Sequence, residues 1–212
     1  MTWLTGDVQL LLLTALSIGV VHTLIGPDHY VPFVALARQR GWTLRRTLGV
    51  TTLCGAGHCA SSVAIGTLGI ALGTGLTKLE SLESARGDIA AWLLLGFGLA
   101  LLARSMQRRK RRHHDDMKLE PTLFASLFVI FVLGPCEALI PLLMFPAATA
   151  NTPAILAVTL VFCTATLITM LVCVGGTLRA LPPVFSEHLS TFGGHVTGAA
   201  IALCGAAMLV GL

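Results

Sequence analysis

The sequence predicts an all-α membrane protein with six transmembrane helices. Its mean hydropathy is +0.84, 55% of its residues are hydrophobic and 11% are charged. A soluble domain carries about 25% charged residues, so this composition indicates a chain that lies in lipid. Apolar stretches recur at about the 20-residue length that a helix needs to cross a bilayer. Basic residues cluster between alternate stretches, as in multi-pass membrane proteins.

Six apolar stretches account for the predicted spans. In chain order they cover about residues 8–37, 47–76, 88–103, 121–147, 153–178 and 190–212. The first is longer than a bilayer requires, and we expect its helix to be broken at Gly26 and Pro27, because proline has no N–H to continue a helix. The fourth should be broken at Gly134 and Pro135. The opening residues lack a basic segment and a small-residue cleavage site, so we expect the first span to be retained.

The two Gly-Pro breaks belong to an internal repeat. Gly26-Pro27 recurs 108 positions later as Gly134-Pro135, and Pro32 recurs at an offset of 109 as Pro141. Each half holds three spans, an odd number, so the two halves would insert with opposite orientation. The predicted organisation is one transmembrane domain over residues 1–212. It comprises repeat 1 at about 8–103, a basic, His-bearing loop at about 104–120 and repeat 2 at about 121–212.

Positively charged residues orient the spans. Those on one side of a six-span chain are Arg38, Arg40, Arg45, Arg46, Arg104, Arg108, Arg109, Lys110, Arg111, Arg112, Lys118 and Arg179. Only Lys78 and Arg86 fall on the other side. The positive-inside rule then predicts cytoplasmic basic loops and external termini, in a bacterial inner membrane. Membrane lipid is a sufficient partner for the Arg/Lys run, so nucleic-acid binding is not required.

Three side chains of the first span are of the type that binds metals. His22, Asp28 and His29 lie within eight positions of one another in an otherwise apolar run. Ionisable groups at membrane depth cost several kcal/mol, so they usually face a cavity or a transport pathway. The adjacent Gly-Pro break can free backbone carbonyls beside them, which predicts an ion site near the membrane midplane. The alternative is a kinked helix with one hydrogen-bonded histidine.

Two other spans contribute further candidate ligands. His58 lies in the second span, and Cys136 and Glu137 follow the second break. Histidine, cysteine and carboxylate together suit divalent Ni, Co, Zn or Fe, whereas Ca and Mg prefer oxygen ligands. The ion would be the transported substrate, and we expect no tightly bound cofactor.

A polar loop and the remaining cysteines have weaker predicted roles. The loop residues His113, His114, Asp115 and Asp116 could capture metal at the cytoplasmic surface, or could form only a solvated loop. The other cysteines lie in apolar runs without a CxxC pair and are expected to pack as small hydrophobic residues. They are Cys54, Cys59, Cys163, Cys173 and Cys204.

Three short motifs resemble the nickel/cobalt transporter group. They are His22 with Pro27-Asp28-His29, Gly57-His58 with Ser61-Ser62-Val63, and Leu133-Gly134-Pro135-Cys136-Glu137. The resemblance is greatest to the branch with a UreH-like transmembrane domain, related to TauE/SafE-type and DsbD-type membrane proteins. In that group four residues separate the first histidine from Asp-His, whereas five separate His22 from Asp28 here. The resemblance implies secondary transport of a divalent transition metal, with Asp28, His29 and His58 as ligands.

Other functions are also compatible with parts of the sequence. Cys136 after Gly-Pro resembles the Pro-Cys breaks of membrane thiol–disulfide carriers, although the matching position in the first half is Asp28. An anion exporter of the sulfite type would suit helix N-termini and basic loops, but Asp28 and Glu137 would repel its substrate. No nucleotide-binding loop or catalytic trio is recognisable, so we do not expect an enzyme. A gradient or an accessory subunit would drive transport, and the chain could form a homo-oligomer.

Overall fold

The computed structural model describes residues 5–73, 75–108, 120–136, 138–148, 151–180 and 184–211. These residues form eight α-helices and one three-residue 3-10 helix, and they contain no strand. The elements are α1 (Thr5–Ile25), η1 (Pro27–His29), α2 (Val31–Arg40), α3 (Leu44–Ala71), α4 (Leu76–Arg108), α5 (Glu120–Leu133), α6 (Leu139–Ala148), α7 (Thr152–Ala180) and α8 (Val184–Leu209).

The helix count differs from the six expected because two stretches are divided. In the first stretch α1 ends at Ile25, immediately before Gly26, and α2 begins at Val31. In the fourth stretch α5 ends at Leu133 and α6 begins at Leu139. Both predicted breaks are therefore present, and each separates a longer helix from a ten-residue one.

The predicted start of the third span at residue 88 was wrong. Helix α4 begins at Leu76, twelve residues earlier, and continues to Arg108. No proline interrupts this segment, and its opening residues include good helix formers, so the helix extends well beyond its most apolar part. Arg86, expected in a loop outside the membrane, therefore lies within a helix.

Four helices are long and apolar enough to cross a membrane. Their apolar segments are Val8–Ile25, Leu44–Ala71, Leu76–Gln107 and Thr152–Ala180, and shorter apolar helical segments cover Pro121–Leu133 and Gly193–Leu209. Large hydrophobic side chains are exposed along the outside of the bundle, among them Leu10, Leu160 and Val172. Extensive exposed apolar surface is unusual for a soluble monomer, so the chain is an all-α membrane protein.

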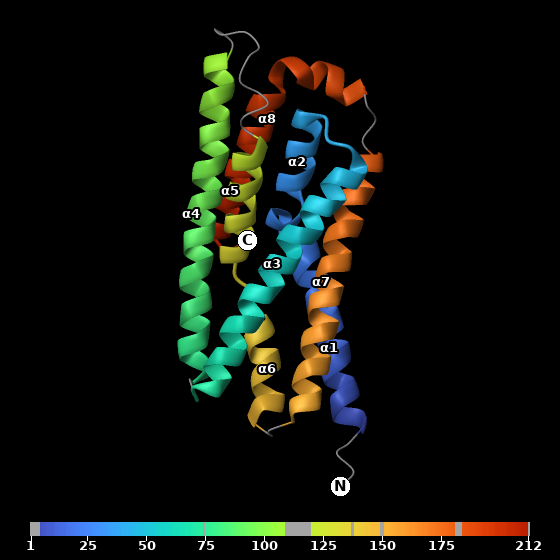
Figure 1. Cartoon of the computed structure of the whole chain (residues 1–212), viewed down its shortest axis with the longest axis vertical. Coiled ribbons are helices and arrows are strands. Elements are labelled where there is room, and N and C mark those ends of the chain that lie inside the picture. Colours follow the sequence, from blue (N-terminus) through green and yellow to red (C-terminus); the bar gives the residue numbers. More distant parts are fainter. Residues whose placement is uncertain are drawn as a thin grey trace.

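The helices pack in close pairs, with α4 along α8 and α1 along α7, while α3 contacts both α5 and α7 (Figure 1). Small residues allow the α4–α8 contact. A Cβ atom on Gly198 would lie 2.8 Å from the Cα of Leu102, and one on Gly98 would lie 2.7 Å from the Cα of Ala202. Side chains would therefore collide with the opposite backbone, and only glycine permits this separation.

The charged ends of several helices meet at one end of the bundle. Figure 1 shows the end of α2, the start of α3 and the ends of α4 and α7 at the upper end, and the N-terminus at the lower end. Among the described basic residues, Arg38, Arg40, Arg45, Arg46 and Arg179 belong to this upper end. The asymmetry of charge predicted from the sequence is thus also an asymmetry of the folded bundle.

Candidate metal site at the first helix break

The first break brings His22 and His29 together. Helix α1 ends because Pro27 lacks an N–H and Gly26 adopts an extended conformation, with φ −80° and ψ 96°. The chain then turns tightly, with the N–H of His29 donating to the carbonyl of Gly26 at 3.1 Å. A Cβ atom on Gly26 would lie 2.7 Å from Nδ1 of His29 and 2.8 Å from Oδ1 of Asp28. Glycine is therefore required for these two side chains to fold back over the break.

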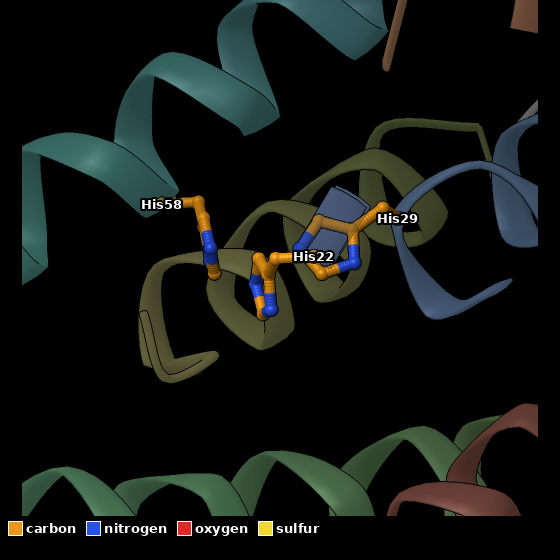
Figure 2. A group of neighbouring side chains, drawn as sticks. All are labelled: His22, His29 and His58. Carbon is orange, nitrogen blue, oxygen red and sulfur yellow. The ribbon is translucent and has the colours of Figure 1, made fainter. Parts of the chain in front are cut away.

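Three imidazoles from separate elements converge beside this break. The ring centroids of His22 and His29 are 4.9 Å apart, and those of His29 and His58 are 5.4 Å apart, both pairs meeting edge to face. One nitrogen from each ring lies within 4.8 Å of the other two. His29 and His58 are each 3% exposed. Figure 2 shows His58 projecting from α3 toward the other two rings.

Hydrogen bonds from Nδ1 of His29 and His58 determine which nitrogen of each ring keeps a lone pair that could bind a metal. Nδ1 of His58 lies 3.2 Å from the carbonyl oxygen of Phe131, and Nδ1 of His29 lies 3.2 Å from the carbonyl oxygen of Gly26. A carbonyl oxygen can only accept, so each neutral ring carries its hydrogen on Nδ1 and a lone pair on Nε2. This is the arrangement of metal-binding histidines whose second nitrogen is held by an outer partner.

The Nε2 atoms of His22, His29 and His58 are all buried, and none has a hydrogen-bond partner among the described residues. Most buried polar atoms in proteins are paired, so three unpaired imidazole nitrogens in one cluster need an explanation. A cation bound at their centre would satisfy all three at once. The arrangement can therefore bind a metal that accepts imidazole nitrogen.

Asp28 joins the cluster through His29. Its Oδ1 lies 3.2 Å from Nδ1 of His29, and its side chain is 21% exposed. A carboxylate in this position makes the imidazole a stronger ligand and offsets part of the charge of a bound cation.

The remaining predicted ligands lie elsewhere or outside the described part of the chain. Cys136 is fully buried in a separate apolar cluster with Leu139, Leu143 and Phe162, and it is not part of the histidine cluster. Glu137 and the loop residues His113, His114, Asp115 and Asp116 lie outside the described residues.

All six cysteines are free thiols, and Cys54, Cys59, Cys136 and Cys204 are buried. One proximity among them was not predicted from the sequence: the side chains of Cys59 on α3 and Cys163 on α7 lie close enough to interact with each other. Sequence spacing could not show this contact, since it depends on how α3 and α7 cross.

A buried ion pair on α4 was also not predicted from the sequence. Glu83 is completely buried and is paired with Arg86, one turn later in the same helix. Its signal in the sequence is a carboxylate and a guanidinium three positions apart, just before an apolar run and with no proline between them, which indicates a pair on one helix but not its burial.

Comparisons with protein-family models, with curated proteins and with solved structures found no significant match.

Proposed function

We propose that the protein transports a divalent transition-metal ion of the Ni, Co, Zn or Fe class, which binds to His22, His29 and His58. The observation that carries the proposal is the set of three buried, unpartnered Nε2 atoms at one helix break. Neutral imidazole is a favourable ligand for these ions and a poor one for Ca or Mg. The resemblance to the nickel/cobalt transporter group, noted on the same residues, supports the proposal.

The distances between the imidazole nitrogens would allow the three rings to bind one ion after small movements. Two imidazole nitrogens bound to one ion at about 2.1 Å can be at most about 4.2 Å apart. The nitrogens here lie within 4.8 Å of one another, so small ring rotations bring them into range. Asp28, and Glu137 beyond the second break, would offset the charge of the ion.

The pairing of the helices supports the inverted-repeat hypothesis. If α1 to α4 correspond to α5 to α8 with the broken spans equivalent, the contact of α1 with α7 corresponds to that of α5 with α3. Likewise the contact of α2 with α8 corresponds to that of α6 with α4, and both pairs of contacts are present. Such repeats place the substrate site of many transporters at the midplane, beside broken helices. We further propose that the basic end faces the cytoplasm of a bacterium, with the N-terminus outside.

A second candidate function is favoured by one observation. Cys59 and Cys163 come from different halves of the chain, and their thiols lie close enough to interact, as transmembrane thiol–disulfide exchange requires. This candidate leaves the three unpartnered histidine nitrogens unexplained.

The decisive experiment measures binding of Co²⁺ and Ni²⁺ to the purified protein, by calorimetry and by the visible absorption of bound Co²⁺. We expect His29→Ala and His58→Ala each to weaken binding by at least about tenfold, and His22→Ala to weaken it measurably. His195→Ala is the matched control, because His195 is half-buried on α8 and outside the cluster. Full-affinity binding by both His29→Ala and His58→Ala would refute the proposed site.

A further inference from the structure

The ion pair on α4 lies directly against the second helix break. Glu83 is 0% exposed and the side chain of Arg86 is 11% exposed. Gly87 allows α4 to approach the break, since a Cβ atom there would lie 2.9 Å from Cγ of Pro135. Charges buried at membrane depth are costly and usually functional, so the contacts of this pair indicate what it does.

Arg86 binds the end of α5. Its Nη2 donates to the carbonyl oxygens of Val132 and Gly134, each at 3.0 Å. The last carbonyls of a helix have no partner within the helix and carry the negative end of its dipole. The guanidinium thus supplies both hydrogen bonds and the matching charge at the point where α5 stops.

Glu83 binds the other side of the same break. Its Oε2 accepts the backbone N–H of Cys136 at 3.1 Å and the hydroxyl of Ser62 at 3.3 Å. Cys136 precedes α6, and its own carbonyl accepts the N–H of Leu139, the first residue of that helix. A carboxylate is therefore placed at the positive end of α6, while a guanidinium is placed at the negative end of α5.

The end of α5, which Arg86 contacts, also orients His58, a candidate metal ligand. Phe131, adjacent to Val132, provides the carbonyl that lies 3.2 Å from Nδ1 of His58. A second connection runs through Ser61, whose hydroxyl accepts from Nη2 of Arg86 and donates to the carbonyl of His58, each at 2.9 Å. Arg86 is thus connected to both the ring partner and the backbone of His58.

We propose that Glu83 and Arg86 are a positioning pair, which holds the break between α5 and α6 so that Phe131 keeps Nε2 of His58 free for a metal. Neither residue is a metal ligand in this proposal. The consequence for metal affinity rests on the proposed function, whereas the effect on the His58 ring can be measured without any metal.

The first test records the ¹⁵N NMR signals of histidine-labelled protein in the absence of metal. In the unaltered protein we expect His58 to be a single tautomer with its hydrogen on Nδ1. Arg86→Lys retains a positive charge, but its single ammonium cannot contact Glu83 together with both carbonyls and Ser61, which in Arg86 are shared between Nη1 and Nη2. His58 should therefore become a mixture of tautomers. His29 should not change, because its Nδ1 contacts Gly26 and Asp28. An unchanged His58 signal in Arg86→Lys would overturn the proposal.

The second test measures Co²⁺ affinity in the double variant Glu83→Gln/Arg86→Gln, which removes both charges, keeps the side-chain volume at position 83 and shortens the side chain at position 86. We expect affinity to fall about tenfold or more, as it does when outer partners of metal ligands are lost. Lys78→Gln/Glu80→Gln is the matched control, because both residues are exposed on the same helix, and it should bind normally.

The two tests separate the two claims. If the unaltered protein binds no Co²⁺ but His58 becomes a mixture of tautomers in Arg86→Lys, the positioning role stands and the metal function fails. If the unaltered protein binds Co²⁺ and the double variant binds it equally well, the metal function stands and the positioning role is refuted.

Discussion

Nδ1 of His58 lies 3.2 Å from the carbonyl oxygen of Phe131, 73 residues later in the chain. The same carbonyl accepts the N–H of Gly134 at 3.1 Å, at the end of α5. A histidine from the first half of the chain is therefore oriented by the backbone of the second half. The candidate site depends on both breaks, although all three of its imidazoles come from the first half.

Replacing Gly134 should disturb this relationship with little effect elsewhere. In Gly134→Ala the new methyl would lie 3.1 Å from Nδ1 of His58 and 3.2 Å from the carbonyl of Phe131, so one of them must move. We expect Co²⁺ affinity to fall by about tenfold, since the outer partner of His58 is displaced. Calorimetry can measure the change. Gly49→Ala, where no atom lies within 4 Å of the new methyl, should bind normally. Equal affinities would show that the Phe131 contact is unimportant.

Replacing Gly198 should instead reduce stability. In Gly198→Val the Cβ would lie 2.8 Å from the Cα of Leu102, and a rigid backbone cannot yield as a side chain could. Overpacking typically costs about 1–3 kcal/mol, so we expect a clear decrease in thermal unfolding temperature in detergent. Gly176→Val on α7 is the control, because no atom lies near its added Cβ. An unchanged unfolding temperature would mean that α4 and α8 separate readily.

Acidification should weaken metal binding. A proton and a metal ion compete for the same Nε2 lone pair, and a protonated imidazole cannot be a ligand. Affinity should therefore be highest above about pH 7 and decrease as the pH falls toward about 5, the range in which histidine commonly titrates. Calorimetry in buffers of different ionisation enthalpy would also detect protons released on binding. Constant affinity over this range would instead indicate carboxylate oxygen ligands, which are already ionised at these pH values.

The cysteine variants distinguish metal transport from thiol–disulfide exchange. Cys136 lies outside the histidine cluster, so Cys136→Ser should change metal affinity or preference only modestly, and Cys163→Ser should be mild. A thiol carrier predicts complete loss of activity in these variants and tolerance of His29→Ala. Metal uptake into proteoliposomes and trapping of mixed disulfides measure the two outcomes separately. Full transport by the histidine variants, with none by Cys136→Ser, would favour the thiol carrier.

Local sequence was sufficient to predict the breaks and most of the histidine cluster. Gly26 and Pro27 end a helix through their own backbone chemistry, and His22 and His29 lie close enough in sequence to meet across the turn that follows. The five-residue spacing between His22 and Asp28, one residue longer than in the nickel/cobalt transporter group, did not prevent His22 and His29 from meeting. The 3-10 turn at Pro27–His29 brings His29 back toward α1.

The contacts across the second break could not be predicted in the same way. Glu83 and Arg86 are close in sequence, but their partners Cys136 and Gly134 are about fifty residues away. Their contacts with the break are visible only once α4 is known to begin at Leu76 and to pass the break at Gly87. A charge near an apolar run is equally compatible with a solvent-exposed helix end, so its pattern alone does not reveal a buried pair.

The glycine contacts between α4 and α8 limit how the bundle can move. At Gly98, Gly198 and Gly205 the two backbones touch without intervening side chains, so sliding one helix along the other would force main-chain atoms into collision. These two helices should behave as one rigid frame, and the ion pair on α4 belongs to that frame. A conformational change that opened the site first to one side of the membrane and then to the other would have to occur at other helix contacts, where flexible side chains lie between the backbones. The broken helices would then rock against a fixed support.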